Sequence, residues 1–168
     1  IPYRVISLNS VSSSSALYSF TEDLENKIVR VNLKERSVKF ETVASLFEKA
    51  DEKERSFLFG RALCSAVICS ETAPESLHSP ETGRLVIAPA ALAASDLSSS
   101  DIVSVGAKNP RNGHVKIISR PSRAARALAR LGVAALIIEG PAEGFHYLLK
   151  ISAGSVQIVS GENYLGLN

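Results

Sequence analysis

Thiols and imidazoles are the side chains of this sequence that could bind a metal ion or act as nucleophiles. The 168 residues contain two cysteines, Cys64 and Cys69, and three histidines, His78, His114 and His146. On one helix, a spacing of five residues turns the two thiols about 140° apart, so they would neither form a disulfide nor share a metal ion. The histidines are far apart and match no metal-ligand spacing. We therefore predict no metal site and, without a Cys-x-x-Cys pair, no iron–sulfur cluster from this chain alone.

Basic and turn residues in the second half of the chain indicate a different chemistry, the binding of an anion. The turn "KNPRNG" contains Lys108, Asn109 and Gly113, and Arg120 lies just before a predicted helix. Backbone N–H groups in a turn and at a helix N-terminus favour negative charge, and a glycine adopts positive φ without steric cost. We expect any anion or cofactor site to lie around these four residues.

A second basic group lies on the predicted helix itself. Arg123, Arg126 and Arg130 are spaced i, i+3 and i+7, which places them on one helix face. Such a stripe is either a solvent-facing surface or a binding surface for phosphate, nucleic acid or an acidic partner. No aromatic residue lies between positions 108 and 131, and the net charge is only +2. Because bases then have no stacking platform, we do not expect nucleic acid as the partner.

Composition places the chain among ordinary globular proteins. Hydrophobic residues make up 45% and charged residues 21%, which is typical of a single domain with a core, here residues 1–168. No apolar run approaches the roughly 20 residues that span a bilayer, and the first residues lack the apolar core of a signal peptide. Two cysteines without a disulfide pattern suit a reducing compartment. We therefore expect a cytoplasmic protein that does not bind membranes.

Periodicity predicts the elements that must position these residues. A single strand is expected over 2–9, and hairpins over 26–33 with 38–43 and over 102–107 with 114–119. A further strand is expected over 84–89, and a three-stranded meander over 133–140, 145–151 and 155–161. Helices are expected over 44–50, 52–69 with an interruption at Gly60, and 122–132. The last has Ser122 as N-cap, Gly132 as its stop and an apolar stripe of Ala124, Ala127, Leu128 and Leu131. The fold class is therefore α+β, rich in β-sheet with interspersed helices.

Five segments, in order, resemble the N-terminal domain of the tungsten-containing aldehyde ferredoxin oxidoreductase family. "NKIVRVNLKERSVKFE" is similar to the family's opening hairpin "G-K-I-L-R-V-N-L", and "LFGRALCSAVI" is similar to its helix entry "G-G-R-G-L-G". "GRLVIAPAAL" resembles "N-K-L-I-F-A-x-G-P-L", "VGAKNPRNG" resembles "V-x-K-S-P-L-T-G", and "RLGVAALIIEGPAEG" resembles "F-A-G-Y-D-A-I-I-I-E-G-K-A-E". The resemblance extends from about residue 26 to residue 168.

The resemblance implies a fold, a cofactor and a site. In this family the domain forms a saddle of β-sheets under a tungsten or molybdenum ion held by two pterins, and later domains supply the cysteines of an iron–sulfur cluster. Electrons from aldehyde oxidation pass through that cluster to ferredoxin. The resemblance thus implies a tungstopterin as cofactor. It places Arg61, which matches the arginine of the helix-entry motif, on the cofactor side together with Lys108, Asn109, Gly113 and Arg120.

The sequence differs from the family pattern where glycines would let the backbone approach a cofactor closely. Phe59 and Ala62 replace two of the motif glycines, and residues 116–122 predict a strand entering a helix in place of a Gly/Ser/Asn-rich stretch. The cluster cysteines and a second glycine-rich segment are not among these residues. We therefore expect a pterin-supporting domain or subunit of a redox enzyme that is not catalytic alone, working with further domains or subunits or as a homo-oligomer. The alternative is a degenerate, stand-alone relative that serves as a scaffold or partner-binding protein without cofactor. Whether the chain is itself an enzyme stays open.

Overall fold

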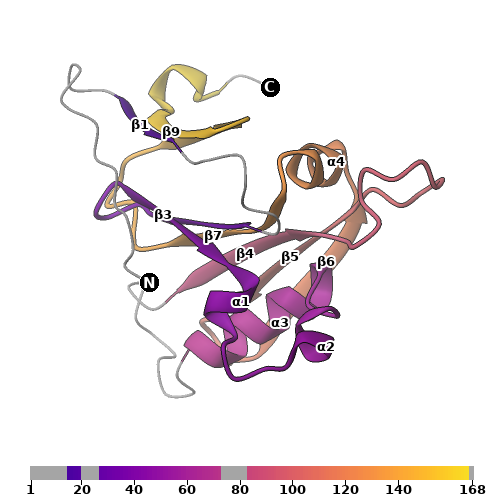
Figure 1. Cartoon of the computed structure of the whole chain (residues 1–168). Helices are drawn as coiled ribbons and strands as arrows, with labels where there is room; N and C mark the ends of the chain where they lie inside the picture. The colour runs from indigo at the N-terminus through magenta and orange to yellow at the C-terminus, as the bar shows by residue number, and fades with distance from the viewer. Residues whose placement is uncertain (1–14, 20–26, 73–82, 167–168) are drawn as a thin grey trace.

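The computed structural model describes residues 27–72 and 83–166, together with the backbone of the strand β1 (Ser15–Ser19). The strand predicted over 2–9 and the side chain of His78 lie outside the described residues. Two β-sheets and several helices make up the described structure (Figure 1). The α+β fold class predicted from the sequence is confirmed.

The larger sheet contains six of the described strands. Their order across the sheet is β3 (Ser37–Thr42), β2 (Lys27–Asn32), β7 (Val133–Glu139), β4 (Arg84–Pro89), β5 (Ile102–Lys108) and β6 (Val115–Pro121). Only β2 and β7 run parallel; the other neighbours are antiparallel. The two predicted hairpins, β2–β3 and β5–β6, are confirmed.

The smaller sheet contains β1, β9 (Ser155–Ser160) and β8 (Tyr147–Ser152), in that order and all antiparallel. The prediction of a meander that includes the preceding strand is wrong, because β7 pairs with β2 and β4 of the larger sheet. Residues 133–137 of β7 are all buried. A strand that is apolar on both faces is most stable in the middle of a sheet covered on both sides, which is where β7 lies.

The two sheets share one of the two apolar cores. Buried side chains of β2 and β7 pack with those of β9 between the sheets, so the smaller sheet covers one face of the larger one. The members of this core are Val29, Val31, Val38, Leu128, Val133, Leu136, Val156 and Ile158.

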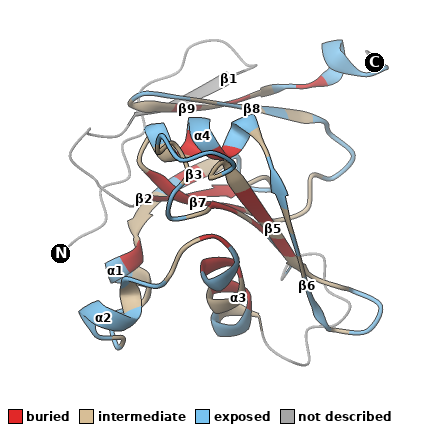
Figure 2. Cartoon of the chain, turned by 90° about the vertical axis from the view of Figure 1, so that its right-hand side faces the viewer, coloured by how far each residue is buried: buried red, intermediate tan, exposed pale blue. Residues whose placement is uncertain are grey.

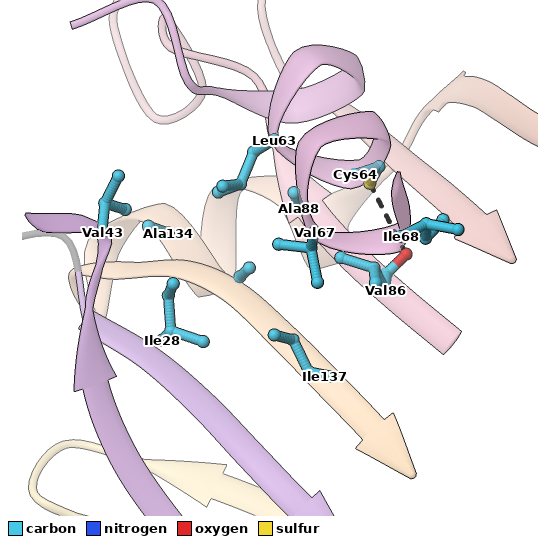
Figure 3. Close-up of a cluster of buried hydrophobic side chains, with 11 residues drawn as sticks. Ile28, Val43, Leu63, Cys64, Val67, Ile68, Val86, Ala88, Ala134 and Ile137 are labelled. Atoms are coloured by element: carbon cyan, nitrogen blue, oxygen red, sulfur yellow. Dashed lines mark hydrogen bonds between the residues drawn. The ribbon is translucent and has the colours of Figure 1, made fainter. Parts of the chain in front are cut away.

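The helix α3 (Gly60–Glu71) covers the other face of the larger sheet, which we call the α3 face (Figure 3). The buried residues of this second core are Ile28, Val43, Leu63, Cys64, Val67, Ile68, Val86, Ala88, Ala134, Ala135 and Ile137. Gly106 of β5 lets the helix approach closely. A Cβ atom there would lie 3.0 Å from Ile68 and 3.1 Å from Cys64. These contacts are tighter than ordinary packing and explain the glycine.

The single helix predicted over 52–69 is in fact two helices. After the short α1 (Val43–Leu46), α2 (Glu52–Arg55) ends at Ser56, and α3 begins at Gly60. Phe59 is extended, with φ −132° and ψ 156°, and Gly60 has φ +48°. A positive φ is strained for residues with a side chain, so the glycine that seemed to interrupt one helix is the point where a new one starts.

The helix α4 (Arg123–Arg130) packs on the face opposite α3, against β4, β5 and β7. Its predicted caps are confirmed: the Ser122 side chain accepts the Ala124 N–H at 3.1 Å, and Gly132 ends the helix with φ +66°. The predicted apolar stripe is partly wrong. Ala125 and Leu128 are buried, whereas Ala124 and Ala127 are exposed, because the helix turns a different face to the sheet.

A short 3-10 helix, η2 (Glu162–Tyr164), follows β9 near the end of the described chain. Among the described helices, none combines the length and the apolar character needed to cross a bilayer.

Candidate functional site

The five predicted site residues do not come together in one place. In the β5–β6 hairpin, Lys108 pairs with Val115 next to the turn, whereas Arg120 pairs with Val103 near the other end of the hairpin. Arg120 lies five positions after Val115 along β6, which corresponds to about 17 Å at about 3.4 Å per residue. The turn with Lys108, Asn109 and Gly113 therefore lies at one end of the hairpin and Arg120 at the other.

The hairpin also separates these residues by face. Side chains alternate along a strand, so Lys108 shares the α3 face with Gly106, which lies against the helix. Arg120 shares the opposite face with its partner Val103. A ligand of ordinary size would not contact both cations.

The turn itself uses most of its backbone donors internally. Asn109 donates to the His114 carbonyl at 2.8 Å, and Gly113 donates to the Asn109 carbonyl at 2.8 Å. The side chains of Asn109 and Asn112 accept the N–H groups of Arg111 and His114 at 2.9 and 3.1 Å. Gly113 has the expected positive φ of +70°. These backbone N–H groups therefore stabilise the turn, and the anion site expected here stays a prediction.

Arg61 is the second residue of α3 and is exposed. No side chain caps this end of the helix, and its first residue, Gly60, lies close to the end of β4 and to β5. A Cβ atom on Gly60 would lie 3.4 Å from Ala90 and 3.5 Å from the Ser104 hydroxyl. Arg61 thus lies at the α3 face, away from the face that bears Arg120.

One of the three arginines of α4 has a structural partner. The Arg126 Nε donates to Asp101 Oδ2 at 2.7 Å, and Asp101 Oδ1 accepts the Ala94 N–H at 3.0 Å. The Asp101 carbonyl also accepts the Ser122 N–H at 2.8 Å. The hydrogen bond from Ala94, and then Arg126, hold the pKa of Asp101 below its usual value. Arg126 thus helps to join α4 to the loop before β5.

The structure shows a charged cluster on the α3 face that we did not predict. Arg30 of β2 is only 8% exposed. It donates to Glu71 at 2.7 and 2.9 Å and to Glu139 at 3.1 Å, and its closest approach to Glu41 is also 3.1 Å. Arg84 lies 2.7 Å from Glu71 and 3.4 Å from Glu139. We call these five residues the Arg30 cluster.

The cluster is structural in character. Burial acts to lower the pKa of Arg30, but the hydrogen bonds to Glu71 and Glu41 outweigh it and raise this pKa above its usual value. Arg30 therefore stays charged and fully hydrogen-bonded. A signal was present in the sequence: Arg30 lies two residues from Ile28 and shares its buried strand face, so it needed carboxylate partners.

The two thiols lie on different sides of α3. Cys64 is buried, with its Sγ 3.6 Å from the carbonyl oxygens of Val86 and Ser104; Figure 3 shows it beside Val86. Cys69 is exposed. Burial raises the pKa of Cys64 to about 11. Within the described residues, no group of three or more His, Cys, Asp or Glu side chains has the geometry to bind a metal ion.

A surface hollow of about 360 Å³ lies where α1, α2 and the start of α3 meet. Its lining residues are Thr42, Val43, Ala44, Glu52, Arg55, Ser56, Leu58 and Phe59. None of the five predicted site residues lines this hollow. The nearest in sequence is Arg61, which lies two residues after the lining residue Phe59.

Comparison with known proteins identifies the family. The model of the aldehyde ferredoxin oxidoreductase N-terminal domain matches residues 28–168. The chain belongs to this family. Among solved structures, it is similar to a chain of the active-site complex BamBC of benzoyl-coenzyme A reductase in complex with 1,5-dienoyl-CoA, with a TM-score of 0.72 and 17% identity. That match covers 84% of this chain but 20% of the other, so this chain spans about a fifth of its length. A search of curated proteins found no match.

Members of this family bind a pterin cofactor, and the described residues do not fit that group by themselves. The expected cations are divided between two faces and two ends of the hairpin, and the turn donors are engaged internally. The segment that would need small residues is the regular strand β6, with Ile117 and Ile118 at its centre. We therefore derive no chemical step through a pterin on this chain.

Proposed function

We propose that this chain is a non-catalytic domain or subunit of an aldehyde ferredoxin oxidoreductase-type redox enzyme. The observation that carries the proposal is that the chain has the family fold but its expected cofactor residues are separated. A domain with this fold but without a ligand cradle supports other segments. The similar BamBC chain is about five times longer than its matched part, which is consistent with such a role.

In this proposal the cofactor of the assembly is the tungstopterin of the family, and most of its ligands come from elsewhere. The contribution of this chain is the surface at the start of α3, where Arg61 is exposed beside an uncapped helix end. Lys108, Asn109, Gly113 and Arg120 then have no shared role in cofactor binding.

The alternative is a partner-binding scaffold without cofactor. One observation favours it: β6 is a regular strand at the edge of the sheet, with exposed aliphatic and basic side chains. A cofactor-binding segment would instead need small residues and free backbone donors.

The two functions are distinguished by analysing the native protein. Under the proposal, it elutes in a large complex that contains tungsten or molybdenum and reduces a dye with an aldehyde, whereas the isolated 168-residue chain shows no turnover above a boiled control. Native protein that elutes without metal and without an associated oxidoreductase would favour the scaffold. Aldehyde-dependent turnover by the isolated chain would overturn both.

A further inference from the structure

The strand β6 ends the larger sheet on one side. Among the described strands it pairs only with β5, and Figure 2 shows it exposed along the edge of the molecule. Half of the backbone N–H and C=O groups of an edge strand point away from the sheet and are available to an added strand. The edge is seven residues long and contains no proline before Pro121, its last residue.

An apolar row crosses the sheet and ends at this edge. Each residue of the row is the cross-strand partner of the next, on the face opposite α3: Phe40, Val29, Leu136, Ile87, Val105 and Ile118. Val29 is fully buried and Leu136 is 6% exposed, whereas Ile118 at the end of the row is 47% exposed. An aliphatic side chain on an added strand would continue this row and cover Ile118.

Two cations flank that position. Lys116 and Arg120 lie two residues before and after Ile118, so all three side chains share one face. Both cations are exposed, and no carboxylate of the described residues pairs with either. Within the described part of the chain, the Arg120 side chain hydrogen-bonds only the Ser119 carbonyl, at 3.1 Å. The edge thus presents the pattern cation, aliphatic, cation.

This pattern disfavours a second copy of the chain as the added strand. In an antiparallel pair of β6 strands centred on Ile118, Lys116 would face Arg120 of the other copy at both ends. In a parallel in-register pair, each cation would face its own counterpart. Like charges directly opposite each other destabilise a strand pair, so the edge repels itself and is complementary to negative charge.

We propose that β6 binds an extended acidic segment of a partner protein as an added strand. The segment has a carboxylate, an aliphatic residue and a second carboxylate at alternate positions, which face Lys116, Ile118 and Arg120. This pattern is symmetric, so it fits in either strand direction. The inference goes beyond the redox role proposed above and does not depend on it, because it rests only on the geometry and charge of β6.

A blocked heptapeptide tests this directly, with glutamate at its second and sixth positions, isoleucine at its fourth, and serine or threonine elsewhere. Fluorescence anisotropy of the labelled peptide with the full chain should show saturable binding that weakens with added salt. Amides of β6 should become protected from hydrogen exchange. In the charge-reversed variant K116E/R120E, binding should fall about tenfold or more, because two cross-strand ion pairs become two like-charge pairs. That variant should instead bind the same peptide with lysines in place of glutamates.

The matched control is R123E/R130E, which reverses two exposed charges on α4 and leaves β6 intact. It should bind the acidic peptide about as well as the parent. Equal losses in both variants would show general electrostatic attraction. Absence of binding, or of protection at β6, would show that this edge does not accept an acidic strand. A concentration-dependent dimer of the parent in which the β6 amides become protected from exchange would identify a second copy as the occupant. Each of these three results overturns the proposal. Circular dichroism of each variant shows whether it is folded.

Discussion

Replacing Arg30 by methionine should destabilise the fold more than the same replacement of any exposed lysine or arginine. In the parent, Arg30 and Arg84 face Glu41, Glu71 and Glu139, so the cluster carries two positive and three negative charges. Without Arg30, three carboxylates share one arginine in a partly buried site. Removing one partner of a buried ion pair typically costs about 3–5 kcal/mol. Because Glu41 and Glu139 keep some contact with water, at 17% side-chain exposure each, we expect about 3 kcal/mol.

Urea denaturation followed by circular dichroism measures this loss. The matched control is Lys39→Met, because Lys39 is the cross-strand partner of Arg30 but is exposed. It should change the free energy of unfolding by no more than about 0.5 kcal/mol. The double variant Arg30→Met/Glu71→Gln should recover part of the loss, since it removes one of the unpaired carboxylates. If Arg30→Met and Lys39→Met are equally stable, the Arg30 cluster does not stabilise the fold and our account of it is wrong.

Two further predictions concern the cores. Ile137→Ala should lower the free energy of unfolding by about 2–5 kcal/mol, because Ile137 is fully buried beneath α3. Ile138→Ala should lower it less, because Ile138 is only partly buried at the other core. Thermal or urea unfolding of the two variants compares them. At pH 8 a thiol-specific dye should label Cys69 alone in the folded protein and both thiols in denaturant. The reason is that burial shields Cys64 and raises its pKa to about 11. Rapid labelling of both thiols in the folded protein would refute the buried position of Cys64.

Local sequence signals predicted the parts of the fold that form between neighbours in the chain. The β2–β3 and β5–β6 hairpins and the Ser122 cap of α4 all depend on short-range patterns. The meander failed because the partner of β7 is β2, about a hundred residues earlier in the chain, and alternation within one strand says nothing about a distant partner. The helix over 52–69 failed because apolar periodicity continues across the extended residue Phe59.

The predicted site residues lie apart for a different reason, and their role stays a prediction. Residues close in sequence were assumed to be close in space, but a β-hairpin separates them both along its length and between its faces. Pairing of Lys108 with Val115 already places Arg120 on the other face from Lys108, as the alternation of side chains requires. The hydrogen bonds of the turn were not predictable in the same way, because they depend on the side-chain conformations of Asn109 and Asn112.

The same residue types therefore have opposite roles at two places on one sheet. Arg30 lies in the interior, where an unpaired charge would be very unfavourable, and the fold supplies it with three carboxylates. Lys116 and Arg120 lie at the edge, where water solvates them and no described carboxylate satisfies them. Charges that are already paired within the fold stabilise the chain, but few of their hydrogen-bonding groups remain free to bind a ligand. Charges that the fold leaves in water are available to a partner. In the described structure, β6 combines such charges with an exposed aliphatic residue and a row of unpaired backbone groups.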